Sequence, residues 1–560
     1  MRPVLLRAGL AAACVCALVL AGCGKHVASN APITFAPADT PYLFANFKGA
    51  PEDVTKAWGE AGDAMMSARI QQIGRFADAI SQKDPTVAAV LNAIQAELAE
   101  VHSGKQLAEA TGFSRSALYA VYGIGDVPVA RVELASPETF KAFWARVEKR
   151  AGITTPTATV DNQTYRVIGS TNGKLRFLVA VEGKQLVMTL APANASPTML
   201  KQLLGLAKPA SNAADKLARV DSQHDYSDYG SGYLDPPRLF ANLFDGKDAV
   251  TQEFAKDMGG GSLANPACAG EFQSLASQIP QVSGGMRTYT ANQIGGSLDV
   301  QLSPVLLGAL TALKQPVPGM GKTSDDSMFD LVLALPLQKW QAFIKGRADA
   351  AAKKTYQCPA LHSLNDFAKT AANPPVQMPP EAASLLGFRM VLDKWDIGPQ
   401  VAGRMLVASS NPAELAQEIQ QTLPQFALKT IATDGKPVAF DLPPRLQAML
   451  GSGNQGWIAA NGNALAIGIG DGEDARLAGT LAAPAGNGDT LLHVHFDGKM
   501  YQVLGSWIGR LAAMGPTANQ AQVQAQVTLF NQMSKMIGSA DVDVKLDDNG
   551  LHIESEVKHR

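Results

Sequence analysis

A long block of sequence occurs twice in this chain, and it constrains the fold more than any other feature. One copy runs from residue 112 to about 205, and the other from 387 to about 481. The number of residues between matching positions in the two copies is nearly constant. The matching positions are Gly112-Phe113 with Gly387-Phe388, Ile124-Gly125 with Ile397-Gly398, Ala130-Arg131 with Gly403-Arg404, and residues 179–184 with 458–463. A repeat this long indicates a duplicated domain and not a short-repeat solenoid.

Local patterns within each copy predict a mixture of strands and helices. Alternating apolar residues predict strands, and Asn461-Gly462 is a strong signal for a two-residue hairpin turn. Ser136-Pro137 and Asn411-Pro412 each predict a helix start, because the first side chain can accept hydrogen bonds from free amides and proline needs no donor there. We therefore predict an α+β fold of two tandem homologous halves, each a mostly antiparallel or mixed sheet packed with helices.

The predicted halves cover residues 37–313 and 328–560, joined by a Pro- and Gly-rich linker at 314–327. The chain has 560 residues, 46% of them hydrophobic and 18% charged, as in ordinary folded proteins. Its formal net charge of -2 gives no support to a nucleic-acid-binding surface, which would need a basic stripe.

The N-terminus carries an export signal. Arg2 and Arg7 flank the start of a small-residue apolar run that is too short to span a membrane, so residues 1–22 are predicted to be a signal peptide. The run ends in Leu20-Ala21-Gly22-Cys23, which resembles the lipobox of bacterial lipoproteins. The resemblance implies cleavage before Cys23 and covalent lipid on that cysteine, and residues 23–36 are predicted to be a tether. Gly24, which is not Asp, implies transfer to the outer membrane, facing the periplasm.

A second, short resemblance follows the predicted tether. Residues 37–40 read Pro-Ala-Asp-Thr before an aromatic strand. This resembles uncharacterised secreted and lipoprotein families of bacteria that open in the same way. The resemblance implies export and a similar fold, and it implies no activity.

Two cysteines remain once Cys23 is lipidated and the leader is removed. Cys268 lies late in the first half and Cys358 early in the second. In an oxidising compartment we predict a disulfide that links the halves. The alternative is two separate buried thiols.

One sequence motif has residue types suited to a metal. On a strand, His493, His495 and Asp497 would share one face and could bind Zn²⁺ or another transition metal. The alternative is a hydrogen-bonded or solvated strand face. Asp541 and Asp543 offer oxygen ligands but lack the order of a calcium loop, and they are interpreted as a charged hairpin end.

These features predict a non-enzymatic envelope lipoprotein of binding or scaffold type, with the lipid on Cys23 as its only bound group. Its expected partners are the membrane, through the anchor, and an envelope protein or an apolar ligand, with no nucleic acid. The alternatives are a metal-dependent hydrolase built at His493, His495 and Asp497, and a carrier of apolar ligands.

Overall fold

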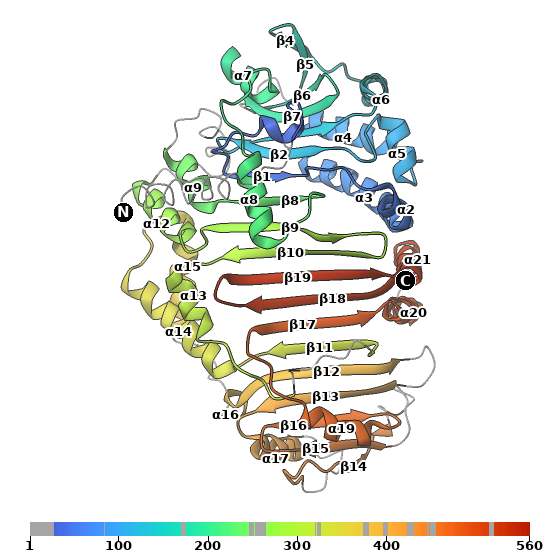
Figure 1. Ribbon diagram of the computed structural model, residues 1–560, viewed down its shortest axis with the longest axis vertical. Coiled ribbons are helices and arrows are strands. Elements are labelled where there is room, and N and C mark those ends of the chain that lie inside the picture. The colour runs from blue at the N-terminus through green and yellow to red at the C-terminus, as the bar shows by residue number, and fades with distance from the viewer. Residues whose placement is uncertain are drawn as a thin grey trace, which may run out of the picture.

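The computed structural model describes residues 27–82, 84–169, 175–245, 251, 265–319, 321, 326–372, 380–395, 401–422, 431–444, 447, 455–514 and 520–560. The signal peptide and Cys23 therefore lie outside the described residues. The fold is α+β, as predicted: helices surround a large antiparallel sheet (Figure 1).

In the described part of the chain, nineteen strands form one sheet, and all of its pairings are antiparallel. The strands from the first part of the chain are β1 (Tyr42–Ala45), β2 (Tyr119–Ile124), β3 (Val127–Glu133), β4 (Thr157–Val160), β5 (Gln163–Ile168), β6 (Leu175–Glu182), β7 (Gln185–Pro192), β8 (Ser231–Leu234), β9 (Gln281–Tyr289) and β10 (Gln293–Gln301). Those from the second part are β11 (Phe329–Ala334), β12 (Leu385–Trp395), β13 (Val401–Ser409), β14 (Val438–Asp441), β15 (Gln455–Ala460), β16 (Ala464–Ile469), β17 (Thr490–Asp497), β18 (Ile537–Leu546) and β19 (Gly550–His559).

The pairing order is nearly the same in the two parts. The first part runs β4-β5-β6-β7-β3-β2-β1-β8-β9-β10. The second runs β14-β15-β16-β13-β12-β11-β17-β18-β19, with one strand fewer at its outer end. The last strands, β10 and β19, pair with each other along their lengths, so neither is a free edge open to other chains. Descent of the two parts from one ancestral unit stays a prediction.

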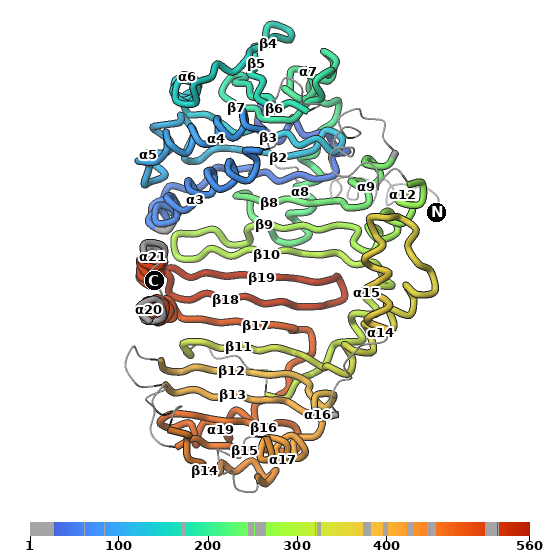
Figure 2. Tube along the Cα trace, turned by 180° about the vertical axis from the view of Figure 1, so that it is seen from behind, coloured from blue at the N-terminus to red at the C-terminus, as the bar shows by residue number. Residues whose placement is uncertain are grey.

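Helices lie beside the ends of the strands and cover the two outer ends of the sheet (Figures 1 and 2). In the first part they are η1 (Pro32–Phe35), α2 (Glu52–Ala57), α3 (Gly59–Ile80), α4 (Pro85–Glu97), α5 (Gly104–Thr111), α6 (Pro137–Ala151), α7 (Pro197–Leu204), α8 (Ala214–His224), α9 (Pro236–Asp245), α12 (Pro266–Ala276) and α13 (Pro304–Thr311). In the second they are α14 (Leu337–Lys353), η2 (Pro359–Leu361), α15 (His362–Ala372), α16 (Pro380–Ala383), α17 (Pro412–Thr422), α19 (Glu473–Ala482), α20 (Lys499–Met514) and α21 (Gln520–Met536). Among the described helices, none has the length and apolar character needed to cross a membrane.

The four larger hydrophobic core clusters of the described residues lie toward the outer ends of the sheet and not at its centre. In the first part, η1, α7 and α8 pack on one face, while α3, α4 and α6 pack on the other. In the second part, α19 and α17 cover opposite faces in the same way. Seen from behind, no helix crosses the middle of β10, β19, β18, β17 and β11 (Figure 2). The view from the front likewise shows no described helix across the middle of these strands (Figure 1), so both faces are open to contact there.

The predicted tether is too long at its C-terminal end. Ile33 and Phe35 are buried in the first core, and Ala36 is fully enclosed. Burial of these apolar side chains stabilises the fold, and that stabilisation would be lost if the segment were a solvated linker. The tether therefore ends before η1, and residue 36 belongs to the folded body.

The predicted linker also packs against the second part of the chain. Val317 is buried in a core of the second part, and the Gly319 amide donates to the Ala483 carbonyl at 3.2 Å. The Lys314 ammonium lies 2.9 Å from the Asp489 carboxylate. The described residues of the predicted linker are therefore packed against the second part of the chain and do not form a solvated linker.

Candidate functional site

A band of polar side chains crosses one face of the central strands, which we call the polar face. The pairing register places His493 of β17 opposite Asp543 of β18, Asp543 opposite Glu554 of β19, and Glu554 opposite Ser297 of β10. Directly opposed side chains on an antiparallel pair are near neighbours. The band therefore follows from strand order, and it crosses the boundary between the two parts of the chain.

Two Asp–His pairs form one end of this band. The Nδ1 atom of His493 lies 3.0 Å from Asp543 Oδ1, and that of His495 lies 2.6 Å from Asp541 Oδ1. Both imidazoles are buried, with 7% and 3% of their surface exposed. The hydrogen bond with His493 outweighs the opposing effect of burial and lowers the pKa of Asp543. A carboxylate on Nδ1 orients the ring and makes Nε2 the basic nitrogen.

The paired histidines border a shallow depression of about 450 Å³ on the polar face. Its walls also carry Arg287, Glu556 and Lys558. The Nε2 atom of His493 is buried and has no hydrogen-bond partner among the described residues, so it does not present a lone pair to the depression.

The predicted metal ligands do not converge. Asp497 is the last residue of β17, and its Oδ1 accepts the amide of Lys499 at 2.7 Å, at the start of α20. This contact forms a short side-chain turn just before the helix, a common role for Asp. Within the ranges that the structure describes, no group of three or more His, Cys, Asp or Glu side chains is arranged to hold a metal ion.

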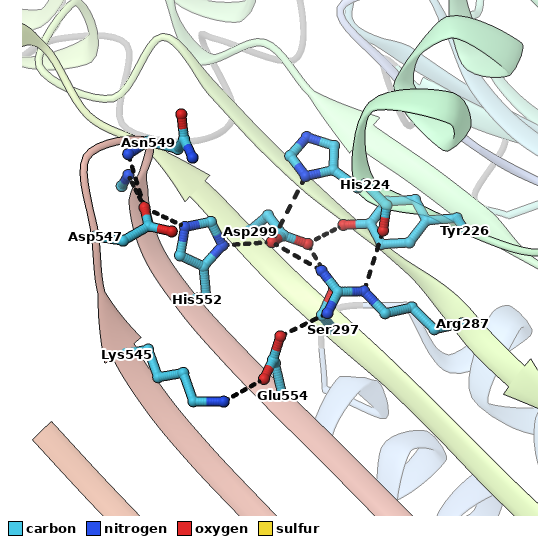
Figure 3. A network of polar contacts seen from close by, with 11 residues as sticks. His224, Tyr226, Arg287, Ser297, Asp299, Lys545, Asp547, Asn549, His552 and Glu554 are labelled. Atoms are coloured by element: carbon cyan, nitrogen blue, oxygen red, sulfur yellow. Dashed lines mark hydrogen bonds and ion pairs between the residues drawn. The ribbon is translucent and has the colours of Figure 1, made fainter. Parts of the chain in front are cut away.

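Asp299 is the centre of a second cluster, where β10 meets β19 (Figure 3). It accepts hydrogen bonds from Tyr226 and from Ser297 (2.6 Å), and its Oδ1 lies 2.6 Å from His552 Nδ1. Burial raises the pKa of Asp299, but these hydrogen bonds outweigh it and lower the pKa overall. For His552, burial lowers the pKa. The hydrogen bonds with Asp299 and Asp547 outweigh burial, so the pKa of His552 is raised above its ordinary value.

Ion pairs extend this cluster toward the two Asp–His pairs. Glu554 bonds to Arg287 at 2.5 Å and to Lys545 at 2.7 Å (Figure 3). Lys545 lies 3.8 Å from Asp543, and Arg287 lies 3.7 Å from Asp299. These contacts tie β9 and β10 of the first part to β18 and β19 of the second. They hold the two parts of the sheet together.

The opposite side of the same strands is apolar, and we call it the apolar face. One row of paired residues runs Leu298, Ile553, Val544, Leu492, Leu333 and Phe388. A second row contains Val542, Val494, Leu331 and Met390, and a third contains Ile294, Val557, Ala540, Phe496 and Phe329. Within the described residues, none of these side chains belongs to a hydrophobic core cluster. The third row is partly covered, because Ala540 is buried and the Phe496 ring contacts Tyr501 of α20.

Several side chains on the apolar face are open to solvent. Leu298 is 41% exposed and Met390 36%, and Phe44 of β1, whose neighbour across the strand pair is Gly232, is 47% exposed. The first two rows, over as many as six strands about 4.8 Å apart, occupy an area on the order of 400 Å². That lies in the range of the largest apolar patch on a typical monomer, and such patches are often functional.

The cysteines are joined as predicted from the sequence. Cys268 in α12 and Cys358 before η2 form a disulfide, with a Cα–Cα distance of 4.7 Å. Phe244, Phe272 and Leu361 pack around it. The bond links the first part of the chain to the second along one end of the strands.

Sequence reasoning missed most of the polar face. It treated Asp541 and Asp543 as the charged end of a hairpin and did not connect them with His493 and His495. The signal was present, since β17 reads His-Val-His and β18 reads Asp-Val-Asp, with matching alternation. It could be recognised only with the register of the two strands, which are separated in the chain by α20 and α21.

Comparisons with known proteins give no match: no family model fits this chain, and neither the curated proteins nor the solved structures include one that is significantly similar to it.

Proposed function

We propose that this protein is a lipid-anchored envelope lipoprotein that acts by binding a partner protein, without catalysis of its own. The lipobox-like residues that end at Cys23 support the anchor and an outer-membrane location facing the periplasm. Several buried acyl chains, at about 0.8 kcal/mol per methylene, would make the attachment effectively permanent.

The solvent-exposed part of the apolar face, which includes Leu298 and Met390, is the observation that carries the binding proposal. Exposed apolar surface of this size costs free energy unless another surface covers it. The face is broad and open, whereas sites for small ligands enclose most of the ligand surface. A protein with a complementary apolar surface therefore fits better than a single lipid molecule.

The polar face supports this assignment in a different way. Its carboxylates and histidines bind one another and the neighbouring cations, which suits a structural brace. Hydrolysis by His493, His495 and Asp497 is not part of the proposal, because Asp497 is engaged at the start of α20.

Co-purification tests the proposal. Full-length protein is crosslinked in intact cells, extracted in detergent and purified, alongside the double variant Leu298→Glu/Met390→Glu. Val305→Glu is the control, because Val305 is an exposed apolar residue (71%) on α13 and not on the sheet. We expect a partner protein with the wild type and the control but not with the double variant.

Two results would count against this function. One is a wild-type preparation that contains only monomer without a partner. The other is a partner retained by the double variant. Lipid extracted in place of protein, and lost in the double variant, would support a carrier of apolar ligands instead.

A further inference from the structure

The chain is fixed to the folded body almost immediately after the predicted lipid-bearing residue. Val27 packs against the first core. The Ser29 carbonyl accepts a hydrogen bond from Lys208 Nζ at 2.6 Å, and the Asn30 carbonyl accepts one from Gln185 Nε2 at 2.6 Å. Ile33, a few residues further on, is 1% exposed. The body therefore holds the chain from residue 27 onward.

Only residues 24–26 separate Cys23 from this fixed point. A fully extended chain advances at most about 3.6 Å per residue, so the four steps from Cys23 to Val27 span no more than about 14 Å. Cys23 bearing lipid must lie at the bilayer surface. The surface around Val27 must then lie within about the same distance of the lipid headgroups.

We infer that the surface of the first half around residues 27–30 and the connection from α7 to α8 is seated directly on the bilayer. Val27, Ser29, Lys208 and Asn212 line one depression of about 420 Å³, so residues 27–30 and this connection form a single surface. This inference rests on the proposed acylation of Cys23. It adds that the body does not swing on a flexible arm: contact with the membrane is centred on this surface.

The sheet carries the other end of the molecule far from this contact. Fifteen strand spacings of about 4.8 Å separate β7, which carries Gln185, from β14, a span on the order of 70 Å. The first core includes Val160 of β4 and Leu178 of β6, while β14 forms the opposite end of the sheet (Figure 1). Two exposed alanines mark the proposed contact and the far end of the sheet: Ala210 lies in the connection from α7 to α8, and Ala432 lies shortly before β14.

Contact quenching in vesicles tests the inference. Full-length acylated protein carrying Ala210→Cys or Ala432→Cys is labelled with bimane without reductant, which leaves the Cys268–Cys358 disulfide intact. It is reconstituted into phosphatidylethanolamine–phosphatidylglycerol vesicles that contain a spin-labelled headgroup quencher. We expect several-fold stronger quenching at position 210 than at 432.

A lengthened tether provides the matched control. About twenty Gly and Ser residues inserted after Gly24 add a root-mean-square span of roughly 25 Å. Quenching at position 210 should then fall toward the value at 432. Equal quenching at the two positions, or no loss with the insertion, would overturn the seated arrangement.

Acylation is measured separately, by incorporation of labelled palmitate and flotation with vesicles. If the protein takes up palmitate and floats but shows equal quenching at the two positions, the proposed anchor stands and only the inferred contact of the body with the bilayer is refuted. A protein that takes up no palmitate loses both.

Discussion

Removal of the disulfide should weaken the fold by an amount set by the loop that it closes. Cys268 and Cys358 are 90 residues apart, and this loop contains strands of both parts of the sheet, from β9 to β11. The chain-entropy relation for a loop of this length gives about 4.6 kcal/mol at 25 °C, and measured losses are commonly about 2–5 kcal/mol. The variant Cys268→Ala/Cys358→Ala should therefore unfold at lower denaturant.

Urea unfolding followed by tryptophan fluorescence measures this loss. With a slope of about 3 kcal/mol per molar urea, a loss of 3 to 4.6 kcal/mol lowers the midpoint by about 1 to 1.5 M. Reductant should produce the same shift in the wild type and no shift in the variant. A loss below about 1 kcal/mol would refute the reasoning, because the loop would then add little constraint to the unfolded chain.

Three further predictions concern stability. Arg389→Met should cost about 3–5 kcal/mol in urea unfolding, because Arg389 binds the buried Asp330 through two hydrogen bonds of 3.0 and 2.7 Å; the double variant with Asp330→Leu should recover much of the loss, and no loss in the single variant would contradict this. His552 has a raised folded-state pKa, so its stabilising effect should be full below about pH 6.5 and disappear as pH rises through that folded pKa; His552→Gln should remove this part of the pH dependence, and an unchanged profile would disprove it. Gly205→Ala should cost at least about 2 kcal/mol, since Gly205 has φ +76° and an added Cβ would lie 1.7 Å from Arg131 Nη1; thermal unfolding at the wild-type temperature would show this prediction to be wrong.

Local signals in the sequence predicted helix starts and hairpin turns well, because residue pairs such as Ser-Pro and Asn-Gly strongly favour one local structure. Ser136-Pro137 begins α6, and the Ser136 hydroxyl accepts the amide of Thr139 at 3.1 Å. The hairpin across Asn461-Gly462 joins β15 to β16. Such starts and turns depend on contacts within a few residues, and a single sequence contains that information.

Contacts between distant segments could not be predicted in the same way. The pairing of β10 with β19 joins residues about 250 apart in the chain, and alternation of polar and apolar residues does not specify which strand lies beside which. For the same reason, His493 and His495 suggested a metal site, although their actual neighbours are Asp543 and Asp541. The tether was misjudged because its small and polar residues resemble a linker, although Ile33 and Phe35 insert into the core.

Site-specific photocrosslinking in living cells tests most directly whether the protein binds a partner through its apolar face. A photoreactive phenylalanine analogue would replace Leu298 on the apolar face or, as a control, the exposed Lys558 on the polar face. We predict a discrete adduct with an envelope protein from position 298 and none from position 558. No adduct from position 298, or the same adducts from both positions, would contradict the proposed binding role.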